Sequence, residues 1–265
     1  MLLTRVISAV VLGPLLLYFV YMGGAFLLFI TAVLALLALH ELFEMVAGLG
    51  LKTWKISGYV GGLILVLGAY LEQGRFLLFL FVLWLIYCLV FFVFSYPQQR
   101  IEDLSFNFLA ITYVVLLFSH IILLRGLNQG IYLTFLAIGL TWATDTGAYF
   151  VGRAMGRHKL APRVSPNKTV EGAIGGVLVA VAVAFAAGRM LPDKSLTPGI
   201  MFVLAVAVGI SAQLGDLVES ALKRFAGVKD SGWLIPGHGG VLDRFDSILF
   251  SIPAVYYLFM VLIIS

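Results

Sequence analysis

The sequence of 265 residues is poor in charge and in cysteine. Only 11% of its residues are charged, against about 25% in a typical soluble domain, and 62% are hydrophobic. The single cysteine, Cys88, excludes an intrachain disulfide and a cysteine metal cluster. There is no G-x-x-x-x-G-K-[ST] phosphate loop, no H-E-x-x-H zinc helix and no G-x-S-x-G nucleophile turn. These absences exclude several common classes of soluble enzyme.

Long apolar runs predict an all-α protein that crosses a membrane repeatedly. A helix needs roughly 20 mostly apolar residues to cross a bilayer core. About nine segments qualify: 6–22, 24–43, 57–72, 76–96, 107–124, 130–152, 171–190, 198–222 and 243–263. We divide them into N-terminal helices, 1–125, and C-terminal helices carrying the polar residues, 126–265, within one membrane unit.

The positions of Lys and Arg predict which side of the membrane each connection faces. Of the 17 basic residues, 13 fall in the set that contains the N-terminus and every second connection, and four fall in the other set. Cytoplasmic loops carry the excess of basic residues. The N-terminus and the two long polar connections, near 153–170 and 223–242, are therefore predicted to be cytoplasmic. Since topology explains the net charge of +4, the expected partner is the bilayer and not a nucleic acid.

Charged residues gather between positions 216 and 246, which hold nine of the 30 in the chain. On a helix, one stripe would contain Asp216, Glu219, Ser220, Lys223 and Arg224, at i, i+3, i+4, i+7 and i+8. Ionisable residues inside an apolar segment are costly and mark functional sites. The stripe therefore predicts a polar pocket at the cytoplasmic side.

Glycines and acids follow this stripe. Backbone N–H groups around His238, Gly239 and Gly240 could form an anion-binding nest. Asp243 and Asp246 lie at i and i+3 at the start of the last helix, where the helix dipole would also hold a phosphate. Oxygen ligands beside cations are what Mg²⁺-assisted phosphoryl or nucleotidyl transfer requires.

A second group of polar residues lies upstream. Asp145 falls in an apolar segment about two turns before its cytoplasmic end, where it could reach the same pocket or form a helix-packing hydrogen bond. The stretch 165–172 is predicted to be a tight turn that leads into a helix, with Asn167 or Thr169 as N-cap. Lys168 could contact phosphate there, or act only as a topology determinant.

Other residues have simpler explanations. The small-xxx-small pairs Gly58–Gly62, Gly152–Gly156 and Gly172–Gly176 predict close helix packing. A solvated loop with mutual ion pairs adequately explains Lys229 and Asp230. Interface anchoring or local pairing is at least as good an explanation as ligation for three residues that end the second segment: His40, Glu41 and Glu44.

The run S-A-L-K-R-F-A-G-V-K-D-S-G-W-L-I-P-G-H-G-G-V-L-D-R-F-D, Ser220 to Asp246, resembles the signature of phosphatidate cytidylyltransferases, also called CDP-diacylglycerol synthases. D-T-G-A-Y-F-V-G-R, from Asp145, and S-P-N-K-T-V-E-G, from Ser165, also resemble segments of that family. Length and the multispanning pattern fit its bacterial branch. The resemblance implies a multi-pass enzyme of the bacterial inner (plasma) membrane that acts in phospholipid biosynthesis. It would convert CTP and phosphatidic acid into CDP-diacylglycerol and pyrophosphate, dependent on Mg²⁺.

The resemblance implies specific roles for the polar residues. The predicted catalytic residues are Asp216, Lys223, Arg224, Asp243 and Asp246. One or two Mg²⁺ ions would be held by Asp216, Asp243 and Asp246. The predicted substrate-binding residues are Asp145, Asn167, Lys168, Ser220, Lys229, Asp230, His238, Gly239, Gly240 and Arg244. The lipid phosphate is already an anion, so no activated serine is required, and catalysis would come from positioning and charge neutralisation.

Three other functions compete with this prediction. A CDP-alcohol phosphotransferase would need D-x-x-D-G and a later G-x-x-x-D, but Ser247 follows Asp246 and no later acid exists. A CTP-dependent polyprenol kinase shares the nucleotide and metal, and would release CDP in place of pyrophosphate. A transporter tends to show repeat symmetry about a midplane site, whereas acids and bases here gather at one face. A homodimer, the acyl-chain preference and the number of metal ions are left open.

Overall fold

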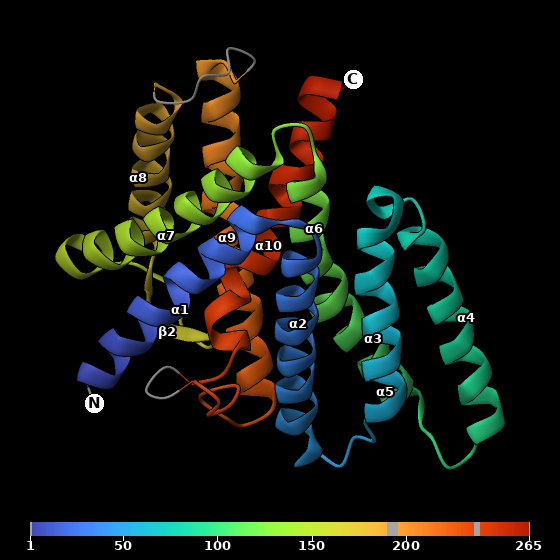
Figure 1. Ribbon diagram of the computed structural model, residues 1–265. Coiled ribbons are helices and arrows are strands. Elements are labelled where there is room, and N and C mark those ends of the chain that lie inside the picture. The colour runs from blue at the N-terminus through green and yellow to red at the C-terminus, as the bar shows by residue number, and fades with distance from the viewer. Residues whose placement is uncertain (1, 190–195, 236–238, 265) are drawn as a thin grey trace. The chain divides into compact units, whose positions relative to one another are not determined.

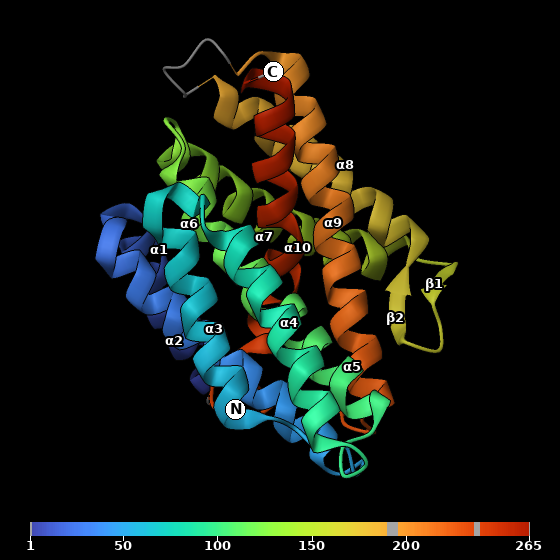
Figure 2. The same cartoon turned by 90° about the vertical axis from the view of Figure 1, so that its right-hand side faces the viewer.

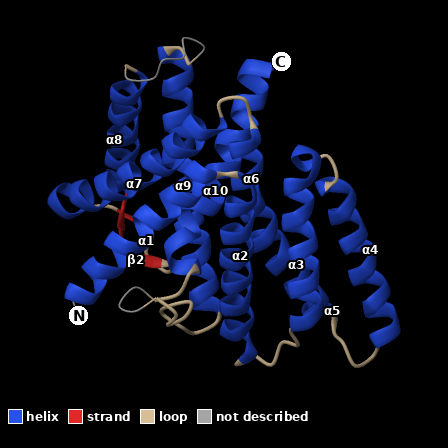
Figure 3. Ribbon diagram, in the orientation of Figure 1, coloured by secondary structure: helices blue, strands red, loops and turns tan. Residues whose placement is uncertain are grey.

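A computed structural model describes residues 2–189, 196–235 and 239–264. Helices dominate it (Figures 1 and 3). In chain order the elements are α1 (Leu2–Met22), α2 (Gly24–Ala47), α3 (Lys55–Tyr70), the 3₁₀ turn η1 (Leu71–Gly74), α4 (Leu77–Ser95), α5 (Ile101–Ala110), the π-helical η2 (Ile111–Leu116), α6 (Leu117–Gly126), α7 (Gly130–Met155), β1 (Lys159–Ala161), β2 (Ser165–Thr169), α8 (Val170–Gly188), α9 (Pro198–Phe225), α10 (Leu242–Phe259) and the π-helical η3 (Met260–Ile264).

Six helical stretches among the described residues are long and apolar enough to cross a membrane. They are Gly24–Ala47, Leu77–Ser95, Ile101–Gly126, Val170–Gly188, Pro198–Phe225 and Leu242–Leu262. The apolar helices Val10–Met22 and Lys55–Tyr70 are shorter, and α7 is not among the six because polar residues such as Thr144 and Asp145 interrupt its apolar sequence. The chain is thus an all-α membrane protein, while about nine spans stays a prediction.

The chain folds into two compact units. The N-terminal unit contains residues 1–128 and 226–244, and the C-terminal unit contains residues 129–225 and 245–265. The second part of the N-terminal unit, residues 226–244, carries most of the family signature and is called here the signature segment. Sequence order alone would have placed this segment with the C-terminal helices.

In the N-terminal unit, α2, α3, η2 and α6 pack around buried aliphatic and aromatic side chains. Gly58 lets α3 approach α2, because a Cβ at this position would lie 2.9 Å from the ring of Phe43. Gly62 faces Val115 of η2 in the same way, at 3.3 Å. The predicted packing role of this glycine pair is therefore confirmed.

In the C-terminal unit, α7, α8 and α9 pack against one another, and α7 and α8 approach most closely. A Cβ at Gly172 would lie 2.8 Å from the carbonyl oxygen of Ala148, and one at Gly176 would lie 2.7 Å from that of Thr144. Side chains larger than hydrogen would separate the two helices. The packing prediction is confirmed for this pair as well.

A two-stranded antiparallel sheet connects α7 to α8, next to α8 and α9 (Figure 2). Its register pairs Lys159 with Thr169 and Ala161 with Ser165. The predicted tight turn is therefore wrong for residues 165–169, which form β2 because their backbone pairs with β1. Thr169 is the N-cap of α8, since its Oγ1 accepts a hydrogen bond from Gly172 N at 3.1 Å.

Candidate active site

A cavity of about 550 Å³ lies within the C-terminal unit, with walls from α7, the β1–β2 sheet, α8 and α9. Four predicted site residues line it: Asp145, Asn167, Lys168 and Asp216. The other lining residues are Ala148, Tyr149, Gly152, Arg153, Leu160, Ser165, Thr169, Gly172, Ala173 and Gln213. The fold thus brings residues of three separate sequence segments to one concave surface, the usual form of a small-molecule site.

An ion pair joins β2 to α9 at the wall of this cavity. Lys168 Nζ lies 2.5 Å from Asp216 Oδ2, and the two side chains keep only 25% and 34% of their surface exposed. Ser220, one turn later on α9, donates its hydroxyl to Asp216 Oδ1 at 3.3 Å. The ammonium group has three hydrogens to donate, so the same lysine can contact a phosphate that enters the cavity.

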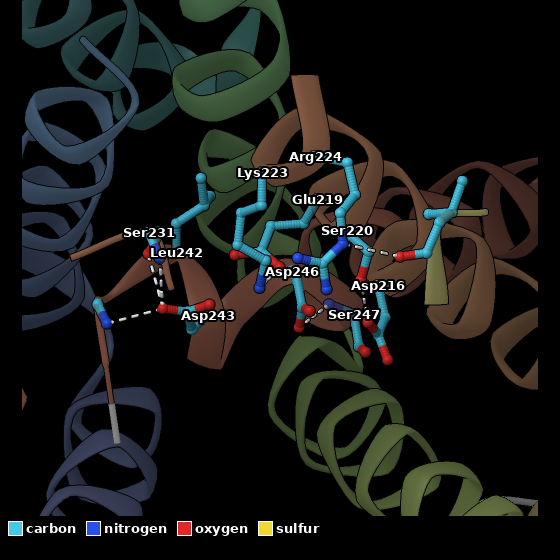
Figure 4. Close-up of polar contacts among 12 residues, drawn as sticks. Asp216, Glu219, Ser220, Lys223, Arg224, Ser231, Leu242, Asp243, Asp246 and Ser247 are labelled. Carbon is cyan, nitrogen blue, oxygen red and sulfur yellow. Dashed lines mark hydrogen bonds and ion pairs between the residues drawn. The ribbon is translucent and has the colours of Figure 1, made fainter. Parts of the chain in front are cut away.

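Asp246 lies beside Asp216 because α9 has a glycine where it meets α10. A Cβ at Gly215 would collide with the backbone carbonyl of Asp246. The half-buried Asp246 carboxylate interacts electrostatically with Asp216 and Asp145, and its Oδ1 accepts a hydrogen bond from Ser247 N at 2.7 Å (Figure 4). Carboxylates of α7, α9 and α10 therefore concentrate negative charge in one region, which attracts a cation.

The other charged residues of the α9 stripe have their own partners. Glu219 is fully buried and forms an ion pair with Lys223, one turn later on the same helix. Arg224 Nε donates to the carbonyl oxygen of Val164, between β1 and β2, at 3.3 Å (Figure 4). The i, i+4 pair of Glu219 and Lys223 is the contact expected of one helical face, whereas Arg224 contacts the β1–β2 connection. The predicted catalytic roles of Lys223 and Arg224 stay predictions.

The signature segment, in the N-terminal unit, is organised around Asp243. Asp243 Oδ2 accepts hydrogen bonds from Ser231 N and Gly240 N, both at 2.8 Å, and from Ser231 Oγ at 2.9 Å (Figure 4). Gly239 has a positive φ of 84°, and a Cβ there would lie 2.6 Å from Asp243 Oδ2. Both predicted cradle glycines thus face a carboxylate of the protein itself. His238 lies outside the described residues.

Three more predicted residues lie on this segment: Lys229, Asp230 and Arg244. All three side chains are exposed. Exposure makes them accessible to an anionic or cationic ligand and equally to solvent, so their substrate-binding roles stay predictions.

Glu41 is a buried acid that the sequence did not assign to this region. It lies on α2 with 3% of its surface exposed. Its Oε1 accepts from Val241 N at 2.8 Å, and its Oε2 accepts from Leu242 N at 2.9 Å and from Ser231 Oγ at 3.0 Å. The carboxylate of Glu41 therefore occupies the start of α10, where the helix dipole was predicted to favour carboxylates and also to hold a phosphate. The sequence feature that could have indicated this role is the position of an acid inside an apolar span.

Local pairing, predicted for the end of α2, is found for the two neighbours of Glu41. Glu44 forms an ion pair with Lys55, and His40 Nδ1 lies 2.8 Å from Tyr59 Oη. Glu41 instead binds the signature segment, so local pairing is wrong for this residue. Its partners are nearly 200 positions away, beyond the reach of any local pattern.

Gln213 lines the cavity without having been predicted. Its Nε2 donates to Ala173 O at 3.1 Å and to Gly209 O at 2.7 Å, which links α9 to α8. Both amide hydrogens are directed at backbone carbonyls, so the side-chain oxygen is the remaining polar group. The sequence feature that could have indicated Gln213 is its position one turn before Asp216 on an apolar helix.

The predicted magnesium ligands are Asp216, Asp243 and Asp246. Asp216 and Asp246 interact electrostatically within the C-terminal unit, and Asp243 belongs to the N-terminal unit. Within the described ranges, no three His, Cys, Asp or Glu side chains are arranged to hold a metal ion by themselves. Magnesium usually takes one or two carboxylates and completes its octahedron with water and substrate phosphate. Asp216 and Asp246 therefore fit this ion.

Comparison with known proteins identifies relatives over almost the whole chain. The model of the cytidylyltransferase family matches residues 3–262. The phosphatidate cytidylyltransferase of Bacillus subtilis (strain 168) is 37% identical over 268 residues, covering 96% of each chain. Those of Staphylococcus epidermidis (strain RP62A) and Staphylococcus aureus (strain COL) are each 36% identical and cover 95% of each chain.

Proposed function

Because the chain belongs to the cytidylyltransferase family, we propose that it transfers a cytidylyl group from CTP to phosphatidic acid, giving CDP-diacylglycerol and pyrophosphate. An oxygen of the lipid phosphate bonds to the α-phosphorus of CTP, and the bond from that phosphorus to the oxygen bridging to the β-phosphate breaks. The structural observation that supports this reaction most is the cavity where Lys168 and Asp216 meet. It offers a cation for phosphate and an acid for a metal ion at one wall.

The residues of the cavity act by binding and positioning. Lys168 contacts a phosphate group and neutralises part of its charge, as a lysine does at many phosphate sites. Ser220 holds the Asp216 carboxylate in one orientation through its hydroxyl. Asn167, on β2 beside Lys168, offers an amide to the same ligand. Alignment of the two substrates for in-line attack then supplies much of the rate enhancement.

Mg²⁺ is part of this proposal. Asp216 and Asp246 would hold the ion, and Asp145 lies close enough to add negative charge. When bound there, Mg²⁺ would supply positive charge that neutralises the reacting phosphates. Asp243 is the third predicted ligand, from the N-terminal unit, and its Oδ2 accepts three hydrogen bonds within the signature segment.

The remaining cations complete the proposal. Lys223, Arg224, Lys229 and Arg244 neutralise the triphosphate and the lipid headgroup. The phosphate cradle around His238 stays a prediction, since Gly239 and Gly240 face the Asp243 carboxylate. The site faces the cytoplasm of a bacterial inner membrane, which the 13 to four division of basic residues supports.

The sequence leaves open whether the protein forms a homodimer. Light scattering of the detergent-solubilised protein would measure its mass and so answer this question.

The first experiment tests the reaction. Purified protein in detergent is given CTP, Mg²⁺ and phosphatidate, and pyrophosphate is measured with and without the lipid. Lipid-dependent release of pyrophosphate together with CDP-diacylglycerol is expected. Release of CDP would instead identify a kinase, and the absence of any nucleotide product would contradict the proposed function.

The second experiment tests the metal ligands. Asp216→Asn and Asp246→Asn are each expected to lower kcat by about 100- to 1,000-fold, because each removes a negative charge that would hold the metal ion. Glu102→Gln, an exposed acid in the first turn of α5, is the control and should retain wild-type turnover. Near-normal turnover in both folded aspartate variants would remove them from the metal site, and the same result for Asp243→Asn would remove that residue.

A further inference from the structure

Glu41 is an ionisable residue buried inside a helix that is apolar enough to span a membrane. Placing a carboxylate there is costly unless hydrogen bonds compensate for the lost water. Glu41 has three donors within hydrogen-bond distance: Val241 N, Leu242 N and Ser231 Oγ, whose single hydrogen is shared with Asp243. All three donors belong to the signature segment, so this acid attaches α2 to the segment that carries the predicted catalytic Asp243.

Glu41 and Asp243 together complete the start of α10. The first N–H groups of a helix have no partner within the helix. Leu242 N, the first N–H of α10, donates to Glu41. In the two residues before the helix, Val241 N also donates to Glu41 and Gly240 N donates to Asp243. Two carboxylates at a helix N-terminus are also favoured by the helix dipole. The donors therefore fix the direction in which α10 starts.

Ser231 connects the two acids directly. Its hydroxyl oxygen lies 3.0 Å from Glu41 Oε2 and 2.9 Å from Asp243 Oδ2. Because a hydroxyl carries one hydrogen, it donates to one carboxylate at a time. A change at Glu41 that redirects this hydrogen therefore changes the hydrogen bonding of Asp243.

Two glycines of the signature segment are explained by the same acid. A Cβ at Gly232 would lie 2.9 Å from Glu41 Cδ, and a Cβ at Gly240 would overlap both Ser231 Oγ and the Glu41 carboxylate. The absence of side chains here allows the segment to close around Glu41. The shape of the segment depends on this contact at several points.

We infer that Glu41 is a positioning residue for the reaction, and that it acts by holding Asp243 and the start of α10 in place. This inference rests on the proposed function. Glu41 itself does not touch substrate in this scheme. Removing its charge therefore changes activity through Asp243, which distinguishes positioning from a general contribution to stability.

The first test compares Glu41→Gln with Glu44→Gln. Glutamine keeps the size of the side chain. In either orientation, however, its NH₂ group replaces an oxygen that accepts from a backbone N–H, of Val241 or of Leu242, so at least one hydrogen bond is lost. Glu44 is exposed, pairs with Lys55 and lies less than one turn away, which makes it a matched control. We expect Glu41→Gln to lower kcat by about 10- to 100-fold, as residues that orient a metal-site ligand commonly do, with the thermal midpoint close to wild type.

The second test asks whether Glu41 acts through Asp243. Glu41→Gln is combined with Asp243→Asn, and kcat is measured for both single variants and the double variant. If Asp243 carries the effect, the double variant is no slower than Asp243→Asn by more than about 2-fold, because coupled residues are not additive. Ser231→Ala serves as a milder variant that removes the hydroxyl between the two acids, with an expected loss of about 10-fold.

The outcomes separate the inference from the proposed function. Wild-type protein without lipid-dependent pyrophosphate release would overturn both. An active wild type with unchanged kcat in Glu41→Gln and Ser231→Ala would overturn the positioning role alone. Losses that multiply in the double variant would also overturn it, since they place Glu41 outside the influence of Asp243. Should Glu41→Gln fail to fold, Ser231→Ala with and without Asp243→Asn decides the question.

Discussion

The approach of α9 to α10 at Gly215 controls how far apart Asp216 and Asp246 lie. Both aspartates lie at this crossing. Asp216 follows Gly215 on α9, and the backbone carbonyl of Asp246 on α10 faces that glycine. An added Cβ would meet that carbonyl, and would lie 3.3 Å from Phe250 Cβ. Normal contact requires about 3.5 Å or more, so Gly215→Ala should move the two helices apart by roughly 1 Å.

This displacement predicts a larger loss of activity than of stability. Overpacking costs about 1–3 kcal/mol, and alanine returns up to about 1 kcal/mol through its higher helix propensity. The net cost, about 0–2 kcal/mol, corresponds to a fall in Tm of no more than about 8 °C. A misplacement of roughly 1 Å can lower kcat by about 100-fold, and we expect that loss here.

The assay measures pyrophosphate release and thermal unfolding of the same detergent preparation. Gly139→Ala is the control, because it lies inside α7 of the same unit and an added Cβ would meet nothing within 4 Å. It should keep wild-type kcat and an equal or higher Tm. Wild-type kcat in Gly215→Ala would refute the reasoning that this crossing sets the geometry of the two aspartates.

Three further predictions follow from the sheet and from the topology. Lys168→Met should raise KM for CTP or phosphatidate by about 10- to 100-fold, since a charge-assisted hydrogen bond to phosphate is lost, while Lys159→Met, at an exposed position of β1, should not change either constant. Thr169→Ala should destabilise the protein by about 1 kcal/mol through loss of the α8 N-cap, and Thr169→Ser should restore most of it; equal melting curves for all three proteins would contradict this role. In a Cys88→Ser background, an impermeant thiol reagent should label Lys159→Cys only from the cytoplasmic side and Arg75→Cys only from the opposite side. Labelling of both from one side would contradict the predicted topology.

Helix positions were largely predictable because each long apolar run must satisfy its backbone hydrogen bonds within itself in lipid. The β1–β2 sheet was not, because Ser165–Thr169 contains proline and several polar residues and lacks the alternation that indicates a strand. Its pairing with Lys159–Ala161 depends on backbone hydrogen bonds across a short connection. The N-cap at Thr169 was one of two predicted candidates, and only the observed helix start decides between them.

The site was predictable as a set of residue types, and only partly as contacts. The stripe on α9 followed from helical spacing, and Asp145, Lys168 and Asp216 were assigned to one pocket before any contact was known. The ion pair between Lys168 and Asp216 was not predicted, because it depends on how β2 meets α9. Glu41 was explained only by interface anchoring or local pairing, since its three donors lie 190 to 201 positions along the chain.

Sequence alone therefore determined that this protein lies in a membrane, which chemistry its polar residues can perform and which family it resembles. These properties depend on composition and on local spacing, both of which are visible without a fold. The tertiary structure decided which acid faces which cation, that residues 226–244 pack with the N-terminal helices, and that Glu41 holds the start of α10. Those contacts arise because buried charges must find partners, and packing selects the partners from segments that are distant in the chain.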